Sequence, residues 1–307
     1  MKETIALKSG SLTFTALSNR PQNEAGVKKF SHLLLLLHGF PDTNATWTES
    51  WEGWNAAFPQ ALIVAPVMPG YERSTCSKMD SDFSQTKIAG HVSQFINQLS
   101  KGADVYLIGH DWGAIAAFKT AQLYPDLVTK VVALAIPYLA NIPLWKLAVK
   151  FPEQAYMSSY MLTMQVPRLY RPKFEQKNDK GQSQYLRLLW EFWSPNWQFS
   201  DDQIQHVSDT LSQPDVLDST TAYYRQMFRD VLRHPLSYKW TVDQDKTPML
   251  LIGGSTDGCM TVNLFEEQAS LLGKDRVVII NGAGHFMQRE NPDEVVKNAV
   301  AFLNATP

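Results

Sequence analysis

The stretch that decides the fold is DVYLIGHDWGAIAAFKTAQL, residues 104–123. Its first five residues are typical of a buried strand, and residues 113–123 are typical of a helix. The turn between them, GHDWG at 109–113, matches the nucleophile elbow G-x-S-x-G with Asp111 in the serine position. A turn this tight strains the backbone and exposes the side chain of Asp111 at the carboxyl end of a sheet, where open α/β folds bind ligands. The alternative is an ordinary glycine-rich turn with a helix-capping Asp.

Strands and helices alternate through most of the remaining chain. Residues 4–17 predict a β-hairpin turning at Ser9-Gly10. Periodicity and turn signals predict further strands at 32–37, 61–65, 130–135, 248–252 and 276–280, and helices at 84–99, 261–271 and 292–303. Alternation of this kind indicates a mostly parallel sheet with helices on both faces.

The segment 138–240 interrupts this alternation. It has no clear buried strand and is rich in Trp, Tyr, Met and Pro. We interpret it as a mostly helical cap inserted into an α/β core formed by residues 1–137 and 241–307. A second independent domain is the alternative, but the strand–helix pattern resumes after the segment and favours an insertion.

The composition excludes several classes of protein. Among the 307 residues, 44% are hydrophobic and 19% are charged, which favours a packed core over disorder. A net charge of −2 without a basic stripe argues against nucleic acid as a partner. The run Leu33–Leu37 is too short to span a membrane, and no signal-peptide stretch opens the chain. Two cysteines without metal-ligand spacing suggest a reducing, cytoplasmic location and no metal site; the oligomeric state is not indicated.

Three further motifs follow predicted strands. The motif HGFP at 38–41 is typical of a loop whose backbone N–H, here that of Phe40, faces an oxyanion. The alternative is a plain turn that ends the strand. GGSTD at 253–257 ends in Asp257, which can orient a histidine or can simply be a turn residue. NGAGHF at 281–286 offers His285 as a general base, the alternative being a capping or exposed histidine. The N–H of Trp112, at the start of the helix, can supply the second oxyanion donor.

Together these motifs resemble the epoxide-hydrolase and haloalkane-dehalogenase branch of the α/β-hydrolases, with soluble epoxide hydrolases the most similar. The resemblance spans nearly the whole chain, and HGFP, GHDWGA and GAGH occur in the family's order with an insertion after the strand at 130–135. It implies an α/β-hydrolase fold with Asp111 as nucleophile, Asp257 as triad acid and His285 as base. An ordinary esterase is disfavoured because position 111 is not serine.

The resemblance also implies tyrosines in the cap that bind and protonate the epoxide oxygen. The family segment W-Y-R-x-M is similar to AYYRQM at 222–227, which assigns Tyr224 to this role. Because adjacent helical residues point about 100° apart, Tyr223 and Tyr224 cannot both face the pocket in the same way; Tyr224 can also be a packing residue. The second family tyrosine is replaced by Thr163, so Tyr160, one helical turn earlier, is the candidate substitute and Tyr156 a weaker one.

The expected reaction is hydrolysis of a small apolar epoxide to a vicinal diol. Asp111 forms an alkyl ester that water, activated by His285, then cleaves, without a metal or organic cofactor. Phe40, Pro41, Trp112 and Tyr156 are expected to line the substrate site.

Two other functions stay open on the sequence. A haloalkane dehalogenase is the principal alternative, because its halide is bound by a Trp directly after the nucleophile. Phe40 lacks the second halide donor, which a cap tryptophan (Trp190, Trp193 or Trp197) would then have to supply. A non-catalytic ligand-binding protein of this fold is disfavoured because all three triad positions are filled.

Overall fold

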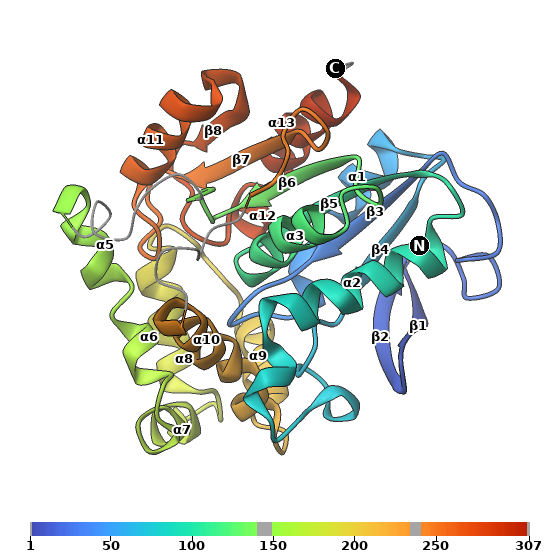
Figure 1. Cartoon of the computed structure of the whole chain (residues 1–307). Coiled ribbons are helices and arrows are strands. Elements are labelled where there is room, and N and C mark those ends of the chain that lie inside the picture. The colour runs from blue at the N-terminus through green and yellow to red at the C-terminus, as the bar shows by residue number, and fades with distance from the viewer. Residues whose placement is uncertain (1, 140–148, 234–240, 306–307) are drawn as a thin grey trace.

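The computed structural model describes residues 2–139, 149–233 and 241–305 (Figure 1). Eight strands form one sheet in the order β1-β2-β4-β3-β5-β6-β7-β8. The β1–β2 and β2–β4 pairs are antiparallel, and the other pairs are parallel. The strands are β1 (Glu3–Ser9), β2 (Leu12–Ser18), β3 (His32–Leu37), β4 (Leu62–Pro66), β5 (Asp104–His110), β6 (Lys130–Leu134), β7 (Met249–Gly254) and β8 (Val277–Ile280).

Helices cover both faces of this sheet because the central strands are apolar on both faces. The alternation of side chains along β3 shows this arrangement: Leu33, Leu35 and Leu37 pack toward α2 and α3, whereas Leu34 and Leu36 pack toward α1 and α13. The core helices are α1 (Trp51–Ala57), α2 (Gln85–Leu99), α3 (Trp112–Leu123), α11 (Val262–Leu272), α12 (Met287–Glu290) and α13 (Pro292–Asn304).

The predicted core elements are confirmed to within two residues at each end. Two core helices escaped the sequence reading. Helix α1 is short, and α12 is a single turn between the His285 loop and α13. Their periodic signal is too brief to separate from a loop.

The segment between β6 and β7 is mostly helical where it is described. Its helices are α5 (Pro152–Met157), α6 (Tyr160–Thr163), α7 (Pro167–Glu175), α8 (Gln184–Trp193), α9 (Asp201–Leu211) and α10 (Val216–Arg233). Figure 1 shows α6 to α10 gathered on one side of the sheet. Buried residues of α8 and α10 join the apolar cluster that lies against Leu35 and Leu37. The boundaries at 138 and 240 stay a prediction, because 140–148 and 234–240 lie outside the described residues.

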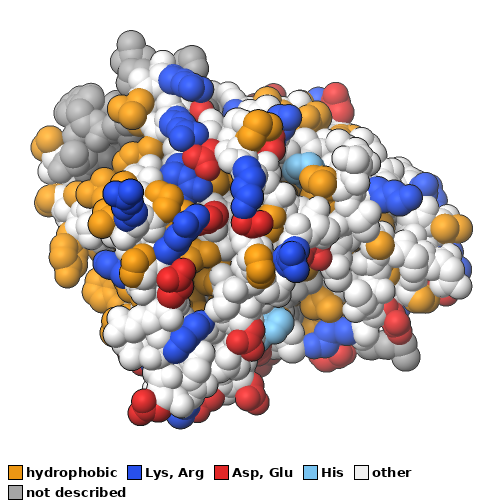
Figure 2. Space-filling view, turned by 90° about the horizontal axis from the view of Figure 1, so that it is seen from below, with side chains coloured by type: hydrophobic (Ala, Val, Ile, Leu, Met, Phe, Trp, Pro, Cys, Tyr) orange, Lys and Arg blue, Asp and Glu red, His pale blue; other side chains and the backbone are white. Residues whose placement is uncertain are grey.

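The surface of this side carries both signs of charge. Figure 2 shows Lys and Arg side chains interspersed with Asp and Glu, and hydrophobic side chains gathered toward one edge. Exposed apolar residues of α5 to α8 include Tyr156, Leu162, Leu169, Leu188 and Phe192. Across the described ranges, no helix combines the length and the apolar character needed to cross a bilayer.

Candidate active site

Asp111 occupies a strained turn between β5 and α3. Its backbone lies at φ 51° and ψ −118°, a conformation that non-glycine residues rarely adopt. The turn packs directly against the end of β3, because a Cβ added to Gly113 would lie 2.1 Å from the carbonyl oxygen of Leu37. The strained turn thus presents the Asp111 carboxylate at the carboxyl end of the sheet, as the elbow motif predicts.

The loop after β3 brings a backbone donor to this carboxylate. The Phe40 N–H donates to Asp111 Oδ1 at 2.8 Å. Gly39 permits the approach, since a Cβ there would lie 2.4 Å from the same oxygen. His38 braces the loop: its Nε2 accepts from the Met68 N–H at 2.9 Å, and its Nδ1 lies 3.1 Å from the Gly39 carbonyl oxygen. Burial lowers the pKa of His38 to about 4, so this brace is a neutral imidazole.

His285 lies between the two predicted carboxylates. Its Nδ1 is 2.9 Å from Asp257 Oδ2, and its Nε2 is 3.7 Å from Asp111 Oδ2. The other oxygen of Asp257 accepts from the backbone N–H groups of Cys259 and Met260 at 2.7 and 2.9 Å. These bonds hold Asp257 so that it accepts the Nδ1 proton, which leaves Nε2 facing Asp111.

The charges around His285 set its protonation. Burial favours the neutral ring, but the carboxylates of Asp257 and Asp111 outweigh it and raise the pKa of His285 to about 10. At neutral pH the imidazole is therefore protonated. Loss of the charge on Asp111 would remove part of the cause and lower the pKa of His285.

Two tyrosine hydroxyls converge near Asp111. The Oη atoms of Tyr160 and Tyr224 are 3.5 Å apart, and the Tyr224 ring packs edge-on against Phe40 and Trp112. Burial is the main cause that raises the pKa of both hydroxyls well above 10, and the Asp111 carboxylate adds to it. Both groups therefore stay protonated and can donate. Tyr223 points elsewhere and donates to the Pro69 carbonyl at 2.7 Å, as the helical geometry predicts.

Tyr156 and Thr163 lie away from the paired hydroxyls of Tyr160 and Tyr224. Tyr156 is 72% exposed and packs against Phe192. Both residues line a pocket of about 290 Å³ that Tyr160 and Trp193 also border. The structure thus brings Tyr160 to Tyr224 and leaves Tyr156 on the outer wall, where its contribution to substrate binding stays a prediction.

Three residues hold the His285 loop, a role that the sequence did not predict for any of them. The Trp193 carbonyl accepts from the His285 N–H at 2.9 Å, and its ring packs against the imidazole. Glu290 accepts from the Gly284 N–H, and Ser194 donates to Glu290 at 2.7 Å. Trp193 and Ser194 belong to the segment between β6 and β7. No local spacing connects them with a histidine more than 90 positions later.

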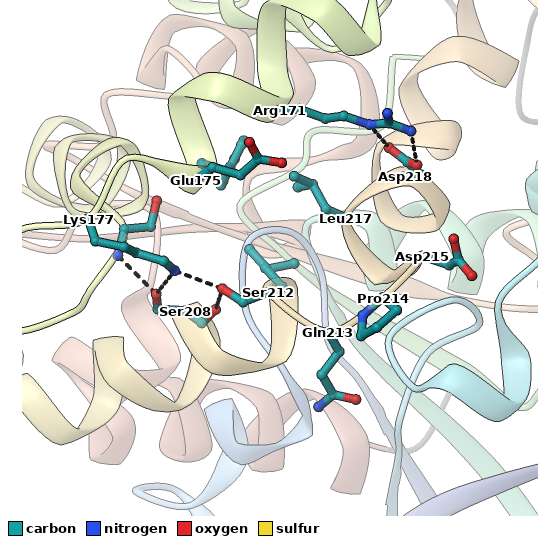
Figure 3. A pocket seen from close by; sticks show the side chains of 13 residues that line it. Arg171, Glu175, Lys177, Ser208, Ser212, Gln213, Pro214, Asp215, Leu217 and Asp218 are labelled. Carbon is teal, nitrogen blue, oxygen red and sulfur yellow. Dashed lines mark hydrogen bonds and ion pairs between the residues drawn. The ribbon is translucent and has the colours of Figure 1, made fainter.

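A separate cavity of about 420 Å³ lies between α7, α9 and α10 (Figure 3). Lys177 donates there to Ser208 at 3.0 Å and Ser212 at 2.7 Å, and Arg171 pairs with Asp218. None of the residues that line it is a predicted catalytic residue. The cavity is thus separate from the predicted catalytic residues.

Comparisons with known proteins identify the fold family of the chain. The family model of the alpha/beta hydrolase fold matches residues 32–292. Epoxide hydrolase 4 of Mus musculus is 26% identical over 277 residues, covering 88% of this chain and 72% of the relative. Epoxide hydrolase 2 of Caenorhabditis elegans is 25% identical over 282 residues, covering 89% and 74%.

Solved structures of similar fold cover nearly all of the chain. A laboratory-evolved variant of potato epoxide hydrolase has a TM-score of 0.77 at 20% identity, with 99% of both chains covered. Epoxide hydrolase A from Mycobacterium thermoresistibile has a TM-score of 0.73 at 19% identity, also with 99% of both chains covered. The chain therefore belongs to the α/β-hydrolase fold family and is a hydrolase of that type, similar to proteins of its epoxide-hydrolase branch.

Proposed function

We propose that this protein hydrolyses epoxides to vicinal diols through a covalent ester on Asp111. The observation that carries the proposal is the pair of protonated hydroxyls, Tyr160 and Tyr224, only 3.5 Å apart near the carboxylate that Phe40 and His285 flank. An epoxide needs a nucleophile on carbon and a proton donor on oxygen, and this arrangement supplies both. The curated relatives that bear the name epoxide hydrolase support the same reaction.

The first step forms the ester. Asp111 Oδ1 is held by the Phe40 N–H, so Oδ2 attacks a ring carbon, a new C–O bond forms and the strained ring C–O bond breaks. An alkoxide is a poor leaving group unless it is protonated, and a hydroxyl of Tyr224 or Tyr160 transfers its proton to it. The product is a hydroxyalkyl ester with a tyrosinate beside it.

The second step cleaves the ester. Esterification removes the negative charge of Asp111, one of the causes that keep His285 protonated. The proton that His285 then releases restores the tyrosine through water. Neutral His285 takes a proton from a second water, whose oxygen attacks the ester carbonyl carbon. The Phe40 and Trp112 N–H groups stabilise the oxyanion on Oδ1. As the tetrahedral intermediate collapses, the ester C–O bond breaks and the leaving oxygen takes the proton of the hydroxyl that water added. The diol departs, Asp111 is again a carboxylate and His285 is again protonated.

A haloalkane reaction would use the same nucleophile but not the tyrosines, because a departing halide needs no proton. We therefore test the proposal with a panel of apolar epoxides and bromoalkanes, assayed for diol and for bromide. We expect diol from at least one epoxide. Tyr224→Phe should lower this activity about 10²-fold and leave any bromide release unchanged, whereas Trp112→Phe should lower bromide release. A wild type that releases bromide and ignores every epoxide contradicts the proposal.

A further inference from the structure

A buried ion pair lies between the loop that carries the Phe40 N–H and the loop that carries His285. Asp42, two residues after Phe40, is fully buried, and the side chain of Arg289, four residues after His285, is 3% exposed. Arg289 Nη1 lies 3.8 Å from Asp42 Oδ1, and its Nη2 donates to the Ala45 carbonyl at 3.1 Å. The pair therefore joins the two loops that bring Phe40 and His285 to Asp111.

The segment between β6 and β7 reaches the same junction. The guanidinium of Arg289 lies over the rings of Trp190 and Trp197, at 5.8 and 5.7 Å. The Trp190 indole N–H also donates to the Pro41 carbonyl at 3.0 Å, directly between Phe40 and Asp42. Through Trp190, helix α8 thus contacts both the loop that carries Phe40 and the Arg289 side chain, which lies next to the loop that carries His285.

The contacts around Asp42 and Arg289 contribute little to the free energy of folding. Within the described residues, Asp42 Oδ2, Arg289 Nε, Arg289 Nη1 and Gln288 Oε1 are buried and make no hydrogen bond. Arg289 Nε lies 3.6 Å from Glu49 Oε2, longer than a good hydrogen bond. A buried ion pair with incomplete hydrogen bonding rarely repays its desolvation. A functional role explains its presence better than a gain in folding free energy.

We propose that Asp42 and Arg289 are positioning residues that align the Phe40 N–H with His285 Nε2 for cleavage of the ester. The inference rests on the proposed function, because only ester cleavage needs both groups at once: one on the oxyanion and one on the attacking water. Ring opening depends mainly on Asp111 and on the tyrosines, which lie outside this junction; the Phe40 N–H only orients the carboxylate in that step and needs no alignment with His285. Loss of the pair should therefore slow the second step and spare the first.

The two steps are separable in steady-state kinetics. The ratio kcat/KM reports events up to ester formation, whereas kcat falls when ester cleavage slows. For Arg289→Gln and for Asp42→Asn we expect kcat and KM to fall together by about 10-fold or more, the scale of a small misalignment. We expect kcat/KM to stay within about twofold. Intact-protein mass spectrometry during turnover should show an alkyl-enzyme adduct that is scarce in the wild type.

A control separates positioning from loss of stability. Lys130 is a buried cation remote from the catalytic residues, and its ammonium donates to the carbonyls of Phe302, Leu303 and Ala305. Lys130→Met should lower Tm without changing kcat or KM of the folded enzyme. If Arg289→Gln does not fold, Arg289→Lys and Asp42→Asn provide the same test.

The outcomes of this experiment are distinct. A wild type that forms no diol contradicts the proposed function itself, before any variant is made. With an active wild type, the inference fails if kcat and kcat/KM fall in parallel with KM unchanged, if neither changes, or if no adduct accumulates. The inference is also contradicted if the effects of Asp42→Asn and Arg289→Gln on kcat multiply in the double variant. Two residues that act through one ion pair should not have independent effects.

Discussion

Replacement of Asp111 by Asn should lower the pKa of His285 sharply. The imidazole Nε2 lies 3.7 Å from Asp111 Oδ2, and the pKa of His285 is raised to about 10. Two unit charges about 4 Å apart interact by about 4 kcal/mol at an effective dielectric constant near 20, which corresponds to a pKa change of roughly three. We therefore expect His285 in the variant to titrate near neutral pH. Esterification removes the same charge, so the variant reproduces the electrostatics of the intermediate.

Nuclear magnetic resonance of ¹⁵N-labelled histidine measures this change directly. The His285 signal is assigned by its loss in His285→Gln and titrated from acidic to alkaline pH in both proteins. His38 and His110 do not interfere, because burial lowers the pKa of each. The reasoning is refuted if His285 of the wild type titrates near its ordinary value, or if Asp111→Asn leaves its pKa unchanged.

The raised pKa of His285 makes the folding stability of the wild type fall as the pH rises. The folded-state pKa of His285 lies above its ordinary value of 6.5, so its protonation stabilises the wild type fully below pH 6.5. That contribution is lost as the pH rises through about 10. In Asp111→Asn the loss should be complete at a much lower pH. Between pH 8 and 10, Tm should therefore decline more steeply in the wild type than in the variant, as thermal unfolding monitored by circular dichroism can show.

Three further predictions concern the reaction and its site. Asp111→Asn should fold and lose all turnover, and in single turnover with ¹⁸O-water the wild type should carry the label in Asp111; label found directly in the diol means direct attack by water. His285→Gln should still form the ester, so its intact mass should rise by that of one epoxide, and the absence of an adduct on every epoxide that the wild type hydrolyses contradicts the role of His285. Tyr224→Phe and Tyr160→Phe should both slow ester formation, and an unchanged pre-steady-state rate in both variants rules out the tyrosines as donors.

The sequence by itself determined the core and indicated the candidate triad. Strand periodicity, turn glycines and the elbow at 109–113 are local features, because the conformation of a short segment depends largely on its own residues. The carboxyl ends of parallel strands meet at one edge, so motifs that follow β3, β5, β7 and β8 had to converge there. Asp111, Asp257 and His285 could therefore be chosen before their distances were known.

Only the tertiary structure decided how the remaining groups meet. Thr163 leaves the second donor position unfilled on the sequence, and only the packing of α6 against α10 shows that Tyr160 reaches Tyr224 whereas Tyr156 stays exposed. The carbonyl of Trp193 at the His285 loop, the pKa of His285 and the pair of Asp42 with Arg289 depend equally on residues far apart in the chain. Such contacts have no local period. They follow from how apolar side chains fill the space between helices and sheet, which a single sequence does not display.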